Sequence, residues 1–419
     1  MSTPQLVEHF FRHEYGRLVA IFVRKVGVQH IDIIEDSVQS ALMAALDSWM
    51  EAGVPEKYSA WLFKVAHNNL IDELRKQTGR DLILEKSAEE IRGSVKVQPD
   101  YFFSSELDDD LLRMLFMCCD NAIAIESQLA LALKTLCGFS VSEIAERLFI
   151  NESNVYKRLS RAKFQLKKMS SGLRELSQKE YTLRLSGVAK TLYLLFTEGY
   201  LSSSNEEPIR RDLCHEAIRL TTILATHRIG EQPEIFALLA LMHLHIARMN
   251  ARQNGTGGLI LLEEQDRASW DMCSISQGMY WLEQSAQGEC FSRYHAEAGI
   301  AAEHCLAPSF EQTRWDKIVE NYVLLERIAP SALHRLNRAV AVAQWQGPSE
   351  GLAIAQDFEF PAWLMESYLL NAVLADLHRR CGHSDKAWHY FQVAQNLAPT
   401  EAIKLLLQRR LNFTDASNV

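Results

Sequence analysis

Hydrophobic residues recur three and four positions apart along most of this 419-residue chain. That spacing places them on one face of an α-helix, whereas the strict alternation that marks a half-buried β-strand is absent. The pattern therefore predicts an all-α protein, and its interruptions indicate where one group of helices ends and the next begins.

Two interruptions divide the chain. The stretch at 79–105, GRDLILEKSAEEIRGSVKVQPDYFFSS, is polar, contains Pro99 and shows no sustained periodicity, which predicts a linker. A weaker boundary is the sequence SSGLRELS at 170–177. The chain is also too long for one ordinary domain. We therefore expect a first domain at 1–80, a linker at 81–105, a second domain at 106–172 and a third at 173–419.

The third domain is predicted to be helical, with loops at YLSSSNEEP (200–208) and ARQNGTGGL (251–259). Its end carries a weak repeat. The residues that precede Pro399 at the small and aromatic positions of a tetratricopeptide unit are Ala375, Ala387, Phe391 and Ala394. Asn371 and His378 stand where that unit usually has Trp and Tyr. We expect a degenerate, tetratricopeptide-like helical repeat, because stacked helix pairs bury one another's apolar faces.

A helix-turn-helix is predicted in the second domain. In GFSVSEIAERLF (138–149), Ser140 and Glu143 form a capping box that starts a short helix. The sequence Ile-Asn-Glu then breaks this helix, and Ser153 is expected to cap a second one. The apolar residues of the second helix that face inward are Val155, Leu159, Ala162 and Leu166. Two short helices joined by a tight turn are typical of this motif.

The second helix carries an unusual charge. The whole chain has a formal net charge of −9, yet INESNVYKRLSRAKFQLKK (150–168) has six cations and one acid. In a helix-turn-helix the start of the second helix lies in the major groove. Arg and Asn suit base edges there, and Lys163, Lys167 and Lys168 suit phosphates. The pattern favours DNA binding over the alternative, a solvated basic face.

The first domain has features of its own. A predicted helix at 34–49 opens with Glu35 and Asp36, and a second follows at 58–77. The buried face of the second helix is expected to consist of Trp61, Leu62, Val65, Ala66, Leu70 and Leu74. Its polar face is expected to hold Lys64, His67, Asn68, Arg75 and Lys76. Asn and cations beside aromatic rings suit single-stranded bases, which are bound by stacking and edge hydrogen bonds.

These motifs resemble the extracytoplasmic-function (ECF) group of sigma-70-type transcription initiation factors. The family pattern E-D-x-x-Q appears in IIEDSVQSAL (33–42), and W-L-x-x-x-A-x-N-x-x-x-D-x-x-R appears in AWLFKVAHNNLIDELR (60–75). The helix-turn-helix follows at the expected distance, so the resemblance covers about residues 1–172 as regions 2 and 4. Ser153 and Asn154 stand where the family often has Gly-Thr, and His67 replaces a frequent Arg.

The resemblance implies partners and roles. Core RNA polymerase would be bound by Glu35, Asp36 and Gln39. The −10 promoter element would be read by Trp61, Lys64, Asn68 and Arg75. The −35 element would be read by Ser153, Asn154, Tyr156, Lys157, Arg158 and Arg161. Two structural alternatives stay open: Trp61 as a core residue, and Glu35 and Asp36 as acids that favour a helix N-terminus.

The remainder of the chain resembles the long C-terminal extension of one sigma-factor subgroup, described as tetratricopeptide-like. The segments that carry this likeness are LYLLFTEGYLSSS, RRDLCHEAIRL, LLEEQDRASWD and LNRAVAVAQWQGPSEGLA. We expect the extension to regulate the sigma domains, by intramolecular contact or by recruiting a partner. The main rival hypothesis is a helix-turn-helix regulator that binds DNA without polymerase and senses a signal through its helical domain. A third hypothesis is a tetratricopeptide scaffold whose DNA-binding part is vestigial.

No enzyme chemistry is expected. The histidines with nearby polar residues are His243, His245, His295 and His304, with Glu297, and their spacing does not fit a helical zinc site. No phosphate-binding glycine loop is present. We therefore expect no catalytic residues, no metal and no cofactor. In the loops, Glu198 and Asp266 are expected to cap helices or pair with arginines, with a partner surface as the alternative.

The cellular site is expected to be the cytoplasm. The first residues lack the layout of a signal peptide, and no apolar run is long enough to span a membrane. The eight cysteines form no C-x-x-C pair and are expected to be reduced, buried thiols.

Overall fold

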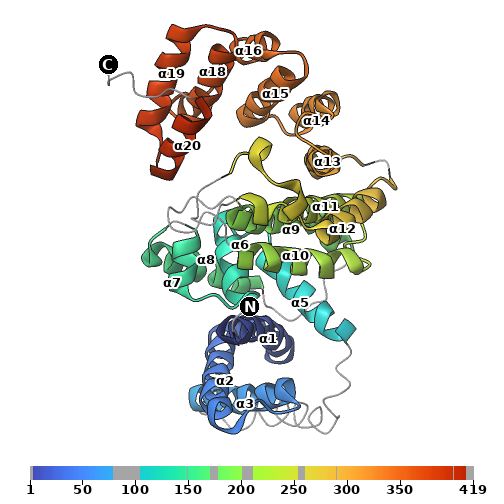
Figure 1. Cartoon of the computed structure of the whole chain (residues 1–419). Helices are drawn as coiled ribbons and strands as arrows, with labels where there is room; N and C mark the ends of the chain where they lie inside the picture. The colour runs from blue at the N-terminus through green and yellow to red at the C-terminus, as the bar shows by residue number, and fades with distance from the viewer. Residues whose placement is uncertain are drawn as a thin grey trace. The chain divides into compact units, whose positions relative to one another are not determined.

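The computed structural model describes residues 3–78, 104–148, 150–169, 178–200, 211–252, 260–288, 290–399 and 401–411. Regular structure in these ranges is helical throughout, which confirms the all-α prediction (Figure 1). The chain divides into two compact units, 1–198 and 199–419, and each is described by itself. Most of the predicted linker, the boundary at 170–177 and most of both predicted loops lie outside the described residues.

The first unit contains eight α-helices among its described residues, the last of which ends just beyond the division, and one 3₁₀ turn. They are α1 (Thr3–Val26), η1 (Val28–His30), α2 (Ile31–Ala52), α3 (Tyr58–Thr78), α5 (Ser104–Cys118), α6 (Ile125–Thr135), α7 (Val141–Arg147), α8 (Glu152–Met169) and α9 (Gln178–Tyr200).

Helices α1, α2 and α3 pack together through the apolar stripes that the sequence predicts. Of the six α3 residues predicted to be buried, Leu62, Ala66, Leu70 and Leu74 are buried, while Trp61 and Val65 are half-buried. His67 was predicted on the polar face and is instead buried, with its ring stacked 6.0 Å from that of Phe63. The aromatic neighbours explain the difference, because they offer the imidazole an apolar contact surface that helical periodicity alone does not reveal.

Helices α7 and α8 form the predicted helix-turn-helix. The capping box is confirmed: the Ser140 hydroxyl accepts from the Glu143 amide at 3.1 Å, and the Glu143 carboxylate accepts from the Ser140 amide at 2.7 Å. The inward stripe of α8 is buried at all four predicted positions. The predicted cap of α8 was wrong, because Asn151 Oδ1, not Ser153, accepts from the Asn154 amide at 2.8 Å.

The N-terminal helices lie directly against the second group of helices. Helix α1 packs on α5 and approaches the end of α6 so closely that a Cβ on Gly16 would lie 2.1 Å from the Leu136 carbonyl oxygen. An ion pair also joins α1 to α5, with Arg24 Nη1 3.1 Å from Asp110 Oδ1. The two predicted sigma domains are therefore packed against each other within one unit.

Helix α9 also packs on this unit, although it follows the predicted boundary at 172. Thr191 donates to Gln128 Oε1 at 3.1 Å, and Arg184 pairs with Asp120 at 2.7 Å. The ring of Tyr181 meets Phe116 edge-on at 4.9 Å. The predicted domain boundary stays a prediction, but these contacts tie residues 181–191 to α5 and α6.

The second unit contains a longer series of helices. Those described are α10 (Arg211–Thr226), α11 (Pro233–Ile246), η3 (Met249–Arg252), η4 (Leu262–Glu264), η5 (Arg267–Ser269), α12 (Met272–Ser285), α13 (Arg293–Leu306), α14 (Trp315–Ile328), α15 (Ala332–Trp345), α16 (Pro348–Gln356), α17 (Ala362–Met365), α18 (Tyr368–Arg380), α19 (Ser384–Leu397) and α20 (Glu401–Leu411). Helix α13 packs on α11 and α14, and from α14 onward each of the longer helices packs mainly on its neighbours in the chain.

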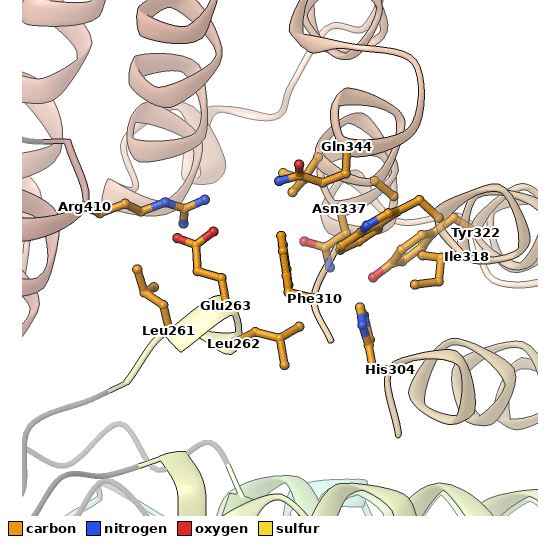
Figure 2. A pocket seen from close by; sticks show the side chains of 13 residues that line it. Leu261, Leu262, Glu263, His304, Phe310, Ile318, Tyr322, Asn337, Gln344 and Arg410 are labelled. Carbon is orange, nitrogen blue, oxygen red and sulfur yellow. The ribbon is translucent and has the colours of Figure 1, made fainter. Parts of the chain in front are cut away.

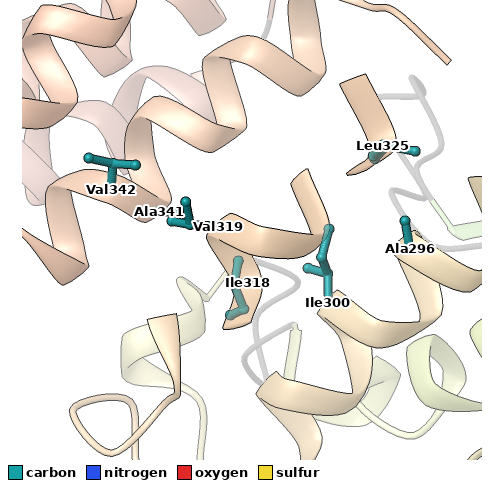
Figure 3. Close-up of a cluster of buried hydrophobic side chains, with 7 residues drawn as sticks. All are labelled: Ala296, Ile300, Ile318, Val319, Leu325, Ala341 and Val342. Carbon is teal, nitrogen blue, oxygen red and sulfur yellow. The ribbon is translucent and has the colours of Figure 1, made fainter. Parts of the chain in front are cut away.

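The cores of the second unit are small and follow one another along the chain. Figure 3 shows one of them, in which Ile300 of α13, Ile318 of α14 and Val342 of α15 meet. A later cluster joins α18 and α19, and the predicted repeat positions Ala375, Ala387, Phe391 and Ala394 are all buried. Serial packing of this kind is how helical-repeat proteins are built.

Two smaller expectations have mixed outcomes. Asp266 caps a helix as predicted, because its Oδ1 accepts from the Ala268 amide at 3.0 Å. All eight cysteines are free thiols; four are buried as expected, Cys305 and Cys381 are half-buried, and Cys273 and Cys290 are exposed. Cys273 lies in the first turn of α12, and Cys290 lies between α12 and α13. Among the described residues, no helix is both long enough and apolar enough to cross a membrane.

Candidate nucleic-acid interface

The outer face of α8 is the first candidate surface. Burial of its apolar stripe leaves the opposite face to solvent, where Ser153, Asn154, Tyr156, Lys157 and Arg161 are exposed. Arg158 is half-buried. A shallow hollow runs along this face, lined mainly by the same residues. The helix thus presents amide, hydroxyl and guanidinium groups together, and these are the groups that recognise base edges and phosphates.

The C-terminal end of α8 has different neighbours. Lys163 Nζ lies 2.7 Å from Asp32 Oδ1 and 2.7 Å from Glu35 Oε2, both on α2. Lys167 Nζ lies 2.6 Å from the other oxygen of Asp32. Lys168 rests 4.4 Å from the centre of the Phe164 ring. In this arrangement, two of the three lysines expected to contact phosphates pair with acids of the first predicted domain.

The electrostatics of this ion-pair cluster favour the charged forms. Burial alone would raise the pKa of Asp32, but hydrogen bonds from Lys163 and Lys167 outweigh it and lower that pKa. Burial alone would lower the pKa of Lys163, but Glu35 and Asp32 outweigh it and raise that pKa. The acids and the lysines therefore stabilise one another's charges across the contact between α2 and α8.

The three predicted polymerase-binding residues do not share one surface. Glu35 is only 4% exposed, and besides Lys163 it accepts a hydrogen bond from Thr135 Oγ1 at 3.0 Å. Asp36 and Gln39 are exposed. Since α2 begins at Ile31, the acid in its first turn is Asp32. The alternative that Glu35 and Asp36 act on the helix N-terminus was therefore wrong, because the dipole acts mainly within the first turn.

The four predicted −10 residues lie along one side of α3. Trp61, Lys64, Asn68 and Arg75 are spaced by three, four and seven residues, which keeps them on one face of the helix. Trp61 is half-buried, with its ring 5.5 Å from that of Trp49, so part of it serves the core as the structural alternative held. Lys64, Asn68 and Arg75 are exposed. The result is a polar row with an aromatic group at one end.

Sequence reasoning missed Asp32 and Thr135, which complete the ion-pair cluster. An acid in the first turn of a helix was visible in the sequence, but nothing local links Asp32 to Lys163, which is 131 residues away. Such a pair becomes apparent only when the packing of α2 against α8 is known.

His295 and Glu297, two of the candidate ligands, have structural partners. His295 Nδ1 accepts from the Ser292 amide at 3.0 Å, and its Nε2 lies 3.2 Å from the Ser285 carbonyl oxygen. Glu297 pairs with Arg293 at 2.6 Å. Within the described ranges, no three His, Cys, Asp or Glu side chains are grouped so as to hold a metal ion.

Three family models match the chain. Sigma-70 region 2 matches residues 11–80, and Sigma-70, region 4 matches residues 116–166. A family of unknown function (DUF6596) matches residues 184–286. The first two models coincide with the helices that carry the candidate surfaces described above.

Curated relatives also match the chain, and two of them are named as sigma factors. "Uncharacterized protein R00370" of Rhizobium meliloti (strain 1021) is 33% identical over 357 residues, which are 84% of this chain and 84% of that protein. "RNA polymerase sigma factor YlaC" of Bacillus subtilis (strain 168) is 24% identical over 42% of this chain and 98% of its own length. A "Probable RNA polymerase sigma factor" of Haemophilus influenzae is 26% identical over 34% of this chain and 79% of its own length. No solved structure gives a significant match.

Proposed function

Because the chain belongs to the sigma-70 family of sigma factors, non-enzymatic proteins that direct RNA polymerase to promoters, we propose how its residues divide that work. Its pair of region 2 and region 4 domains is typical of ECF sigma factors. In the proposal, α2 binds core polymerase, α3 binds the −10 element and α8 binds the −35 element. The observation that carries it is the exposed polar and basic face of α8 inside the region 4 match.

Binding of the −35 element is proposed for Ser153, Asn154, Tyr156, Lys157, Arg158 and Arg161. The proposal is supported by their positions in the first ten residues of α8, the part of a recognition helix that enters the major groove. Arg158 is the strongest candidate for a base contact, because its partial burial limits the side-chain entropy lost on binding.

Binding of the −10 element is proposed for Trp61, Lys64, Asn68 and Arg75. Their common face on α3 supports this assignment, since a melted strand needs a row of cations beside groups that contact bases. Asn68 is exposed in the middle of a helix, where it contributes little to helix stability.

Polymerase binding is proposed for Glu35, Asp36 and Gln39. Asp36 and Gln39 are accessible in the free chain, whereas Glu35 is covered by Lys163 and Thr135. We therefore propose that polymerase binds an opened form, in which α8 has withdrawn from α2 and both Glu35 and the lysines are released.

The C-terminal helices are proposed to form a tetratricopeptide-like regulatory domain that acts on the sigma domains in cis or through a partner. The serial packing of α13 to α19 supports the architecture. The proposed work with polymerase and promoter DNA would take place in the cytoplasm.

The test is reconstitution with core RNA polymerase, followed by a pull-down and run-off transcription from a matched promoter. Asp36→Arg should weaken polymerase binding by about tenfold or more, because a charge reversal in a complementary interface costs well over 1 kcal/mol. Glu359→Arg makes the same charge change at an exposed position of the second unit and should bind normally. Equal binding by both variants, or no transcription by the unmodified chain, would contradict the proposal.

A second experiment concerns the extension. A chain ending at residue 198 retains all of the first unit, including the contacts of α9, whereas a chain ending at 172 loses them. If the extension regulates transcription, the chain ending at 198 should differ from the full chain in run-off assays while remaining folded. Identical transcription by the full chain and the chain ending at 198 would rule out the regulatory role.

A further inference from the structure

A cavity of about 300 Å³ lies within the second unit, walled by α13, α14 and α15 and bounded by η4 and α20 (Figure 2). Most of its lining comes from residues beyond 286, where the match to the family of unknown function ends. Its size falls at the lower end of the range for small-molecule sites, which combine apolar walls with a few polar groups. The residues of this cavity take no part in the proposed binding of polymerase or DNA.

Aromatic rings form one end of the cavity. The rings of Phe310 and Trp315 meet at 68° with their centres 5.1 Å apart, and Tyr322 extends the same wall. The Tyr322 hydroxyl is hydrogen-bonded to the side chain of Asn337, and burial raises the pKa of Tyr322 to about 12, so the phenol stays neutral. A flat ring is the ligand that such a wall accommodates best, because offset and edge contacts between rings add to the burial of apolar area.

His304 supplies a polar group with no partner. It lines the cavity beside Trp315, with ring centres 5.4 Å apart, and its Nδ1 is buried without a hydrogen bond in the described part of the chain. Burial, together with the Arg248 and Arg267 guanidinium groups, lowers the pKa of His304 to about 3, so its imidazole is neutral. A buried polar atom without a partner is unfavourable, because it has lost its hydrogen bonds to water. A bound molecule with a polar group at this point would remove that cost.

Opposite charges stand at the other end. Figure 2 shows the side chains of Glu263, from η4, and Arg410, from α20, facing one another on one side of the cavity. The acid nearest to Arg410 is Asp376 at 3.9 Å, but Asp376 lies closer to Arg379, at 2.9 Å, and to Arg380, at 3.7 Å. Asp376 therefore compensates the charge of Arg410 only weakly.

We propose that this cavity binds a small zwitterion with an aromatic ring, of the aromatic α-amino-acid class. The ring would lie against Phe310 and Trp315, the carboxylate would pair with Arg410, and the ammonium group would pair with Glu263. A ligand with a carboxylate alone would be repelled by Glu263, and one with an amine alone would be repelled by Arg410. An aliphatic amino acid would leave the aromatic wall unfilled.

The binding test uses the full chain and isothermal titration calorimetry with L-tryptophan, L-phenylalanine and L-tyrosine. At least one should bind with a Kd below about 1 mM. For that ligand, analogues lacking the carboxylate or the ammonium group (tryptamine and indole-3-propionate for L-tryptophan) should bind about tenfold more weakly or worse, as should L-alanine. No binding by any of the three amino acids overturns the proposal, as does equal binding by an analogue that lacks one charge.

Matched variants locate the site. Arg410→Gln and Glu263→Gln should each weaken binding about tenfold or more. Their neighbours Arg409 and Glu264 pair with each other at 2.7 Å and do not line the cavity. The variants Arg409→Gln and Glu264→Gln should therefore bind the ligand as the unmodified chain does. Circular dichroism and thermal melting establish that all four variants are folded. Equal loss in a variant and its neighbour, or binding unchanged by Arg410→Gln and Glu263→Gln, would place the ligand elsewhere and overturn the proposal.

Discussion

The two halves of α8 are both net positive but have different neighbours. The N-terminal half exposes Asn154, Lys157 and Arg161, whereas the C-terminal half holds Lys163 and Lys167 in ion pairs with α2. A count of basic residues would treat the helix as one DNA-binding surface. Its surroundings divide it into a half available to DNA and a half that joins region 4 to region 2. The following predictions test that division.

The largest effect is expected where the junction is most buried. Glu35→Ala removes the acceptor of Thr135 and one partner of Lys163, so the free energy of unfolding should fall by about 2–4 kcal/mol. Chemical denaturation measures this change in the free energy of unfolding. Glu73→Ala breaks only the more exposed pair with Lys76 and should cost less than about 1 kcal/mol. Similar losses for both variants would mean that Glu35 contributes no more than a surface acid.

In the available half, Arg158→Ala should reduce promoter affinity by about 1–3 kcal/mol if Arg158 contacts a base, and only for the preferred −35 sequence. Fluorescence anisotropy with matched and scrambled duplexes, at one fixed salt concentration, measures it. A loss of the same size on every sequence would reassign Arg158 to a phosphate. The comparison variant is Lys168→Ala, which should lower affinity for all sequences alike.

A smaller effect is expected from the exposed side of the junction. Asp32→Asn removes the acid shared by Lys163 and Lys167 without altering the DNA-facing half of α8. Since Asp32 is about half-exposed, each pair is worth about 0.5 kcal/mol, and the opened form should gain about two- to fivefold in population. Core polymerase should then bind more tightly by the same factor. The control is Glu320→Gln, which breaks an exposed pair with Lys317 in the second unit. Weaker polymerase binding by Asp32→Asn would contradict the proposal that polymerase binds only after α8 has withdrawn from α2.

The smallest effect concerns pH. The pKa of Asp32 is lowered in the folded chain, so its contribution is present above its ordinary value of 3.8 and is lost as the pH falls through the lowered pKa. The pKa of Lys163 is raised, so its contribution is present below 10.5 and is lost as the pH rises through the raised pKa. The difference in unfolding free energy between the unmodified chain and Asp32→Asn should therefore be constant near neutral pH and shrink in acid. A difference that persists unchanged below pH 3.8 would show that the carboxylate charge is irrelevant.

Much of the local structure follows from the sequence, because it depends on neighbours in the chain. The capping box at Ser140 and the buried stripe of α8 are set by helical spacing, and both are confirmed. The positions around Phe391 are buried, while the repeat itself stays a prediction. The cap at Asn151 was missed because two polar residues competed for the role and only geometry decides between them.

Contacts between segments that are distant in the chain could not be predicted from the sequence. Lys163 and Glu35 are 128 residues apart, and no periodicity relates them. The cavity of the second unit likewise combines Glu263 of η4 with Arg410 of α20, two residues that look like ordinary surface charges in the sequence. Sequence patterns report which face of a helix is buried, whereas its partner is chosen by the packing of the whole unit.

The close approach of α1 to α6 at Gly16 makes the contact between regions 2 and 4 sensitive to the size of this one residue. A single methyl group there would overlap the Leu136 carbonyl oxygen, and backbone cannot move aside as a flexible side chain does. The Gly16→Ala methyl group would therefore push α1, which belongs to region 2, away from the end of α6, which belongs to region 4, without altering any charge. One carbon atom would accomplish sterically what polymerase is proposed to accomplish by binding.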